Sequence, residues 1–300
     1  MGKNKASVAN KKARQQRSRS SSSTWIWTSI AVLAIAVVVG FIFLLRSLES
    51  STSSVATEKR IPVPPTLLSA LENVPMTLLQ NVGVGQTINQ PAKVNGAPPL
   101  TKNGKPEIFY FGAEYCPYCA AERWALIIAL SKFGHFSNLS EITSAANDVY
   151  PNTHTFSFYK AKYTSPYISF MPVEVYTNQE NSAGNGYVPL ETPTKQEIGL
   201  VQKYDAPPYA QQQGGIPFID FGNKFIISGS NYSPQILAGL NWTQIATNIY
   251  NPTTQVSKGI LGSANYIIAM TCDLTNQKPS NVCGLRYIQS LEKTLIKSKT

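Results

Sequence analysis

The sequence predicts an α/β domain that follows a single N-terminal membrane-spanning helix. The apolar run Glu107–Phe111 is typical of a buried strand, and apolar residues with helical spacing begin directly after it at Pro117. Further strand and helix patterns alternate down to Tyr204, and a hairpin and more helices follow them. The membrane helix is predicted from a third feature, a run without any charge from Trp25 to Leu45.

The first 45 residues have the pattern of an uncleaved membrane anchor. Residues 25–45 are long enough to cross a hydrocarbon layer of about 30 Å. Residues 1–24 hold seven Lys and Arg and no acidic residue, so the positive-inside rule places this tail in the cytoplasm. The alternative is a signal peptide cleaved near Ser54-Val55-Ala56, but its apolar segment would exceed the usual length of about 7–15 residues. We therefore expect a single-pass protein of the cell membrane with an extracytoplasmic C-terminal domain.

The net charge of +10 does not indicate nucleic-acid binding. The basic tail supplies +7 of it, which leaves +3 for the other 276 residues. Those residues show no basic stripe of the kind that nucleic-acid binding needs. Charged residues make up 14% of the chain, below the roughly 25% of typical soluble domains, and this composition suits an extracytoplasmic surface.

The chain after the anchor divides into a linker and one domain. Residues 46–65 are rich in Ser and Thr and then in Pro, as is typical of a linker. Residues 66–300 are expected to form the folded domain. Its predicted elements include one or two short helices over residues 66–81, broken at Pro75, a strand over residues 171–176 and a hairpin over residues 216–228. Helices are also predicted over residues 195–204 and 233–250.

Cys116 and Cys119 stand in the motif Cys-Pro-Tyr-Cys at the start of a predicted helix. Proline is favoured at the first helical position, so this spacing places both sulfurs near the helix N-terminus. Unpaired backbone N–H groups and the positive end of the helix dipole stabilise a thiolate there. We expect Cys116 to be the nucleophile and Cys119 to resolve the mixed disulfide that it forms.

The remaining cysteines, Cys272 and Cys283, are expected to form a structural disulfide, because disulfides persist in an oxidising compartment. A second redox pair is the alternative. A zinc site built from all four cysteines is another, but the ten-residue gap between the last two is not a usual spacing of zinc ligands. We therefore expect neither a metal nor another cofactor. The two histidines, His135 and His154, are expected to have surface or structural roles.

Two segments resemble the thioredoxin superfamily. Residues 109–119 resemble its active-site strand and loop, and Gly215-Ile216-Pro217-Phe218 resembles its second signature. The longer stretch Gly104–Asn138 is similar to a narrower group of membrane-anchored, largely archaeal thioredoxin-like proteins without an established function. The resemblance implies a thioredoxin-like fold, and the length of the connection after the first helix implies an insertion at about residues 136–196.

The resemblance also implies roles for the residues around the dithiol. Pro217 is expected to follow a cis peptide bond and to orient the substrate, whose backbone pairs with Ile216. Three residues of the first motif are also expected to contact the substrate: Tyr115, Pro117 and Tyr118.

Tyr110 departs from the pattern of that superfamily. Many thioredoxins carry a buried carboxylate at this position, six residues before the first cysteine, where it serves proton transfer. The Pro-Tyr dipeptide between the cysteines resembles glutaredoxins, but it does not establish glutathione binding.

Together these features lead to one expected function and two alternatives. We expect a thiol–disulfide oxidoreductase or isomerase that acts on the thiols and disulfides of exported proteins and is reset by an unidentified redox partner. A copper metallochaperone or assembly factor is the first alternative, although few Met or His residues lie near the dithiol. A non-catalytic surface binding protein on the same fold is the second.

Overall fold

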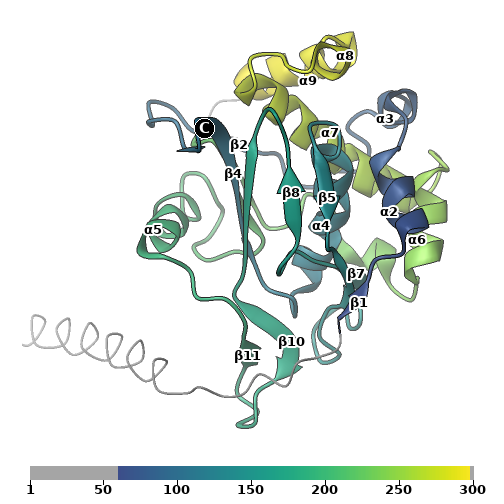
Figure 1. Ribbon diagram of the computed structural model, residues 1–300, viewed down its shortest axis with the longest axis vertical. Helices are drawn as coiled ribbons and strands as arrows, with labels where there is room; N and C mark the ends of the chain where they lie inside the picture. Colours follow the sequence, from purple (N-terminus) through teal and green to yellow (C-terminus); the bar gives the residue numbers. More distant parts are fainter. Residues whose placement is uncertain (1–59, 298–300) are drawn as a thin grey trace, which may run out of the picture. The chain divides into compact units, whose positions relative to one another are not determined.

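The computed structural model describes residues 60–297, so the predicted tail, the anchor and most of the linker lie outside the described residues. Within residues 60–297, no helix has the length and apolar character needed to cross a membrane. This part of the chain is a mixed α/β unit with a central sheet that carries helices on both faces (Figure 1).

The central sheet is arranged around β4 (Lys105–Gly112). On one side β9 (Ser169–Glu174) runs parallel to β4, and on the other β12 (Phe218–Phe221) runs antiparallel to it. The hairpin partner β13 (Phe225–Ser228) follows, and the short β2 (Ala92–Lys93) lies at its outer edge. Because both faces of the sheet are covered, β4 is a continuous apolar run rather than an alternating one. The short β3 (Thr101–Lys102) pairs with the start of β4.

Different helices cover the two faces of this sheet (Figure 1). The helices α4 (Pro117–Leu130) and α7 (Gln255–Leu274) pack together on one face, in a core that includes Tyr110. On the other face Phe109 packs in a smaller core with residues of α5 (Lys195–Tyr204). Successive side chains of a strand point to opposite faces, so neighbouring residues of β4 enter different cores.

The helices outside the sheet agree with the sequence predictions better at the N-terminal end than at the C-terminal end. The predicted break at Pro75 separates α2 (Pro65–Glu72) from α3 (Met76–Val82). The helical pattern predicted over Ser233–Tyr250 is interrupted, because Asn241 caps a new helix through a hydrogen bond from the Gln244 N–H. The elements of this region are a 3₁₀ helix (Pro234–Leu237), α6 (Trp242–Ile249), α8 (Ser280–Cys283) and α9 (Arg286–Lys297).

The insertion expected at residues 136–196 is divided by β9, which belongs to the central sheet. This range is therefore divided into one segment before β9 and one after it, which are called the two extra segments below. The first segment contains β5 (His135–Ser137), β6 (Ser140–Thr143), β7 (His154–Ser157) and β8 (Lys162–Thr164). The second forms the hairpin of β10 (Tyr176–Glu180) and β11 (Tyr187–Pro189). At the N-terminal end β1 (Ile61–Pro62) pairs with β6.

Cys272 and Cys283 form a disulfide, as expected for this pair. It joins the last turn of α7 to α8, so it fixes the C-terminal helices to the core. Since these two sulfurs are bonded to each other, they are not free to complete a zinc site with the other two cysteines.

We predict that the Cys272→Ala, Cys283→Ala double variant loses about 2–3 kcal/mol of unfolding free energy, because the closed loop no longer restricts the unfolded chain. The bond spans 11 positions. Urea denaturation without reductant, followed by circular dichroism, measures the change. Equal midpoints for the variant and the parent protein would contradict a stabilising role.

Asp220 is a buried carboxyl group at the far end of the β12–β13 hairpin from the dithiol. Its Oδ1 accepts a hydrogen bond from the Asn223 N–H at 2.6 Å, while its Oδ2 is buried without a partner in the described structure. Burial raises the pKa of Asp220 to about 7. The folded protein therefore binds this proton more tightly than the unfolded chain, and stability falls as pH rises from about 4 to 7.

We predict that the loss of stability between pH 5 and pH 8 is smaller in Asp220→Asn than in the parent protein, by at most about 2–3 kcal/mol. Urea denaturation at the two pH values measures the loss. Asp273→Asn is the matched control, because Asp273 pairs with Lys224 at the surface and should leave the pH dependence unchanged. Asp205, whose pKa burial raises to about 6, accounts for part of the loss that remains. An unchanged pH dependence in Asp220→Asn would show that this carboxyl is not the source.

Candidate active site

The dithiol lies where the central strand passes into the helix α4. β4 ends at Gly112, and Cys116 is the N-cap of α4. The Cys116 Sγ accepts a hydrogen bond from the Cys119 N–H at 3.2 Å. Both thiols are free; Cys116 keeps 4% of its surface exposed and Cys119 none. The first sulfur is therefore the one closer to solvent, at the start of the helix.

The two thiols have opposite pKa shifts. Burial alone would raise the pKa of Cys116, but hydrogen bonds from Cys119 and the charge of Arg123 outweigh it, so the pKa is lowered. Burial raises the pKa of Cys119 well above its ordinary value, and the hydrogen bond and negative charge of Cys116 add to this. This arrangement favours a thiolate at Cys116 and a neutral thiol at Cys119.

A cis-proline loop faces the dithiol. The Ile216–Pro217 peptide bond is cis, and it immediately precedes β12. When protonated, the Cys116 thiol donates to the Ile216 carbonyl oxygen at 3.6 Å, across 100 positions of sequence. The structure therefore brings together four of the predicted site residues: Cys116, Cys119, Ile216 and Pro217.

A fully buried ion pair that the sequence analysis missed lies beside the dithiol. Arg123 Nε and Nη2 donate to the two carboxylate oxygens of Glu174 at 2.9 and 2.7 Å. Nη2 also donates to the Ala113 carbonyl oxygen at 2.8 Å, so it contacts the loop that carries Cys116. Arg123 lies one turn beyond Cys119 on α4. Two adjacent charged residues, Glu122 and Arg123, in an otherwise apolar stretch of helix were the only sequence signal for this pair.

Tyr110 occupies the position where the resemblance predicts a carboxylate. Its side chain is fully buried, and its hydroxyl has no hydrogen-bond partner within the described residues. Burial raises the pKa of Tyr110 well above its ordinary value, so the phenol does not act as a base near neutral pH. A Cβ at position 112 would clash with this hydroxyl, so a glycine at this position makes space for the Tyr110 side chain. The charges beside the dithiol are therefore those of Arg123 and Glu174.

Glu114 fixes the loop between β4 and the dithiol. Its carboxylate accepts hydrogen bonds from Arg60 at 2.5 and 3.2 Å and from the Ser157 hydroxyl at 2.5 Å. The side chain is buried, so these bonds are protected from water. The first described residue of the chain is thereby joined to the loop of Cys116.

Tyrosines from both extra segments surround the dithiol motif. The ring of Tyr115 stacks on that of Tyr187 with centroids 4.1 Å apart and lies 6.3 Å from that of Tyr176. Tyr118, which is 37% exposed, packs edge-on against Tyr150 at 5.9 Å. Tyr115 and Tyr118 thus belong to an aromatic rim. The third residue expected to contact a substrate, Pro117, is instead buried at the first position of α4, so its position supports a role in starting the helix.

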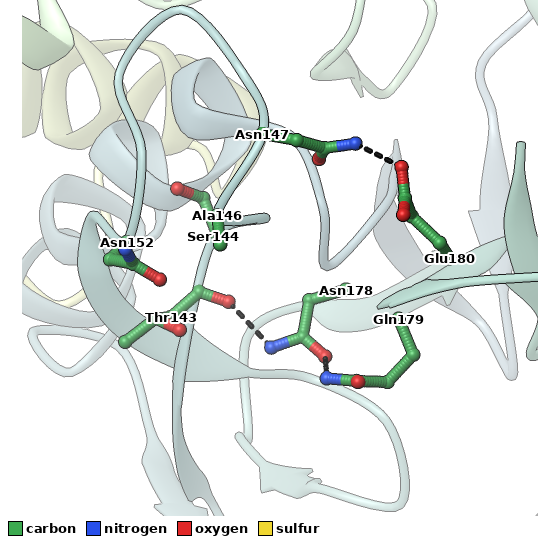
Figure 2. Close-up of a pocket in the computed structure, with 8 residues that line it drawn as sticks. All are labelled: Thr143, Ser144, Ala146, Asn147, Asn152, Asn178, Gln179 and Glu180. Atoms are coloured by element: carbon green, nitrogen blue, oxygen red, sulfur yellow. Dashed lines mark hydrogen bonds between the residues drawn. The ribbon is translucent and has the colours of Figure 1, made fainter. Parts of the chain in front are cut away.

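A polar pocket lies between the loop after β6 and the hairpin β10–β11. Its volume is about 330 Å³. Figure 2 shows Asn147 bonded to Glu180 and Asn178 bonded to the Thr143 carbonyl across it, the latter at 2.9 Å. The lining residues are Thr143, Ser144, Ala146, Asn147, Asn152, Asn178, Gln179 and Glu180.

The histidines have other partners than the dithiol. His154 packs edge-on against Trp242 with ring centroids 4.2 Å apart, and the exposed His135 lies 4.0 Å from Glu72. Across residues 60–297, no group of three or more His, Cys, Asp and Glu side chains is placed to hold a metal ion.

Comparison with known proteins gives one family match. The model of a family described as "Domain of unknown function (DUF929)" matches residues 90–273, a range that includes the dithiol, the cis-proline and the Arg123–Glu174 pair. No curated protein and no solved structure matches the sequence.

We predict that removing the Arg123 charge raises the pKa of Cys116, because that charge stabilises the thiolate. Arg123→Met alone would leave Glu174 buried without its cation, which is strongly destabilising. The test therefore uses the Arg123→Met, Glu174→Gln double variant. Its rate of Cys116 alkylation by iodoacetamide should fall roughly three- to tenfold at pH 7 and recover at higher pH.

Arg123→Lys is the matched control for this measurement, because it keeps the positive charge and loses the bidentate hydrogen bonds to Glu174. Its alkylation profile should stay close to that of the parent protein. Circular dichroism shows whether each variant is folded. An unchanged pH profile in a folded double variant would show that Arg123 does not set the reactivity of Cys116.

Proposed function

The chain belongs to the DUF929 family, a domain of unknown function, and we propose that it is a thiol–disulfide oxidoreductase with a thioredoxin-like fold. The observation that carries this proposal is the unequal pair of thiols at the start of α4. Cys116 has a lowered pKa and faces the carbonyl oxygen before a cis-proline, while the buried Cys119 stays protonated. An attacking thiolate and a protected resolving thiol are what stepwise disulfide exchange requires.

The order of elements supports the proposed fold. β4 leads into the dithiol helix α4, the parallel strand β9 follows, and after α5 come the antiparallel hairpin β12–β13 and the long helix α7. This order supports the thioredoxin-like fold that the sequence resemblance implies, with the two extra segments on either side of β9.

The exchange proceeds in two balanced steps. The Cys116 thiolate attacks one sulfur of a substrate disulfide, a new S–S bond forms, and the other substrate sulfur leaves as a thiolate that takes a proton from water. Cys119 then gives its proton to water and attacks the Cys116 sulfur, and the second substrate sulfur leaves as a thiolate that takes up a proton. Two electrons pass to the substrate, and the protein is left with a Cys116–Cys119 disulfide. The same steps in reverse oxidise a substrate dithiol.

The proposed setting is the outer side of the cell membrane. The uncharged run at residues 25–45 and the basic tail before it support an anchor with the domain outside. The Cys272–Cys283 disulfide is in keeping with an oxidising compartment. Exported proteins are therefore the proposed substrates, and a separate redox partner resets the dithiol.

We predict that the protein catalyses reduction of insulin or reoxidation of scrambled ribonuclease, and that Cys116→Ser abolishes this activity. Cys119→Ser should instead accumulate a mixed disulfide with the substrate, because the first attack still occurs and the second cannot. Mass spectrometry detects that adduct and locates it on Cys116. Stoichiometric copper binding by the reduced protein without any exchange activity would overturn the proposal in favour of a metallochaperone.

A further inference from the structure

The pocket described above lies next to the dithiol because both of its walls are bonded to the loop that carries Cys116. In the first wall, the Ala145 N–H donates to the Tyr115 carbonyl oxygen at 2.9 Å. For the second wall, the Glu114 N–H donates to the carbonyl oxygen of Tyr176, the first residue of β10, also at 2.9 Å. A polypeptide held at Cys116 therefore has the pocket within reach of its neighbouring side chains.

The chemistry of the pocket favours a cation. Most lining groups are neutral amides and hydroxyls, and the one charged lining residue is Glu180. Glu180 is held in place from the opposite wall, since it accepts a hydrogen bond from Asn147, which itself accepts one from the Tyr187 hydroxyl at 2.9 Å. Figure 2 shows the Glu180 and Asn147 side chains directed toward one another. A carboxylate without a cation beside it attracts a positive group.

A second acidic group reinforces this field. Burial raises the pKa values of Tyr115, Tyr118 and Tyr187, and the negative charge of Asp148 raises all three further. Asp148 therefore lies close to the tyrosines on both sides of the dithiol. Among the described residues, Arg60 is paired with Glu114 and Arg123 with Glu174, so neither arginine is free to offset these carboxylates. Glu180 and Asp148 therefore both favour a positive group at the pocket.

The pocket has room for one long side chain. Its volume of about 330 Å³ lies at the lower end of the roughly 300–1,000 Å³ usual for small-molecule sites. We propose that it receives a lysine or arginine side chain of the polypeptide whose sulfur Cys116 attacks. This inference rests on the proposed function and names its substrate class: polypeptides with a basic residue near the reacting cysteine. Glutathione, with two carboxylates, meets no lysine or arginine among the described residues that line this pocket.

The test measures how fast peptides react with Cys116. Each peptide contains one cysteine joined as a mixed disulfide to 2-nitro-5-thiobenzoate, and Lys, Ala or Glu is placed in turn at each of the four positions on either side. The full-length Cys119→Ser protein is used, so the reaction stops after one step. The Cys116 thiolate bonds to the peptide sulfur, the peptide–thiobenzoate bond breaks, and the coloured thiolate is released.

We expect a Lys peptide to react about five- to tenfold faster than its Glu counterpart at one or two positions, in low salt. Glu180→Gln, which preserves the shape of the side chain, should remove most of that ratio. Asp273→Asn removes one negative charge from the surface salt bridge with Lys224 and should leave the ratio unchanged. The effect of Glu180→Gln separates the pocket from any effect of lysine on the chemistry of the peptide itself.

The outcomes distinguish the two proposals. Equal rates for Lys and Glu peptides at every position, or a ratio that survives Glu180→Gln, would overturn the pocket assignment while leaving the exchange reaction intact. If no peptide reacts faster with the Cys119→Ser protein than with the Cys116→Ser, Cys119→Ser protein, the proposed function is overturned. The pocket assignment is then overturned with it.

Discussion

The dithiol helix α4 is enclosed on all sides, and thirteen of its fourteen residues are buried. A polar group that lacks a partner in such a position costs about 1–3 kcal/mol, and an unpaired charge costs more. The two charged residues of α4 therefore depend on groups from distant parts of the chain. Arg123 pairs with Glu174 of β9, and Glu122 accepts hydrogen bonds from Ser230, Asn231 and Ser263.

These two charges are stabilised in different ways, and only one of them affects the dithiol. Glu122 has neutral donors alone, so burial raises its pKa despite the hydrogen bond from Ser263, and the contact mainly fixes α4 to α7. Arg123 has a full countercharge in Glu174, which keeps it protonated inside the protein. A permanently charged group can thus lie near both sulfurs without exposing the dithiol to water. The Arg123 charge adds to the hydrogen bonds from Cys119 in lowering the Cys116 pKa, and no carboxylate at position 110 opposes it.

Local sequence patterns predicted the elements that hold the site, but not the contacts between them. The helix predicted over Lys195–Tyr204 is α5, whose start is fixed locally by a capping box between Thr194 and Glu197. The Arg123–Glu174 pair, by contrast, joins residues 51 positions apart. The helix α9 was not predicted, and β9 was predicted as a strand without its place beside β4. Periodicity reports which face of an element is apolar, whereas these features depend on which elements become neighbours.

The parallel pairing of β4 and β9 explains why the second extra segment lies at the dithiol. Parallel strands end at the same edge of a sheet, and here Gly112 of β4 lies opposite Glu174 of β9. The loop of Cys116 leaves β4 at this edge, and the hairpin β10–β11 leaves β9 at the same edge. The segment that follows β9 therefore begins beside the loop of Cys116. Under the proposed function, its side chains would select the substrate while α4 and the cis-proline loop carry the exchange.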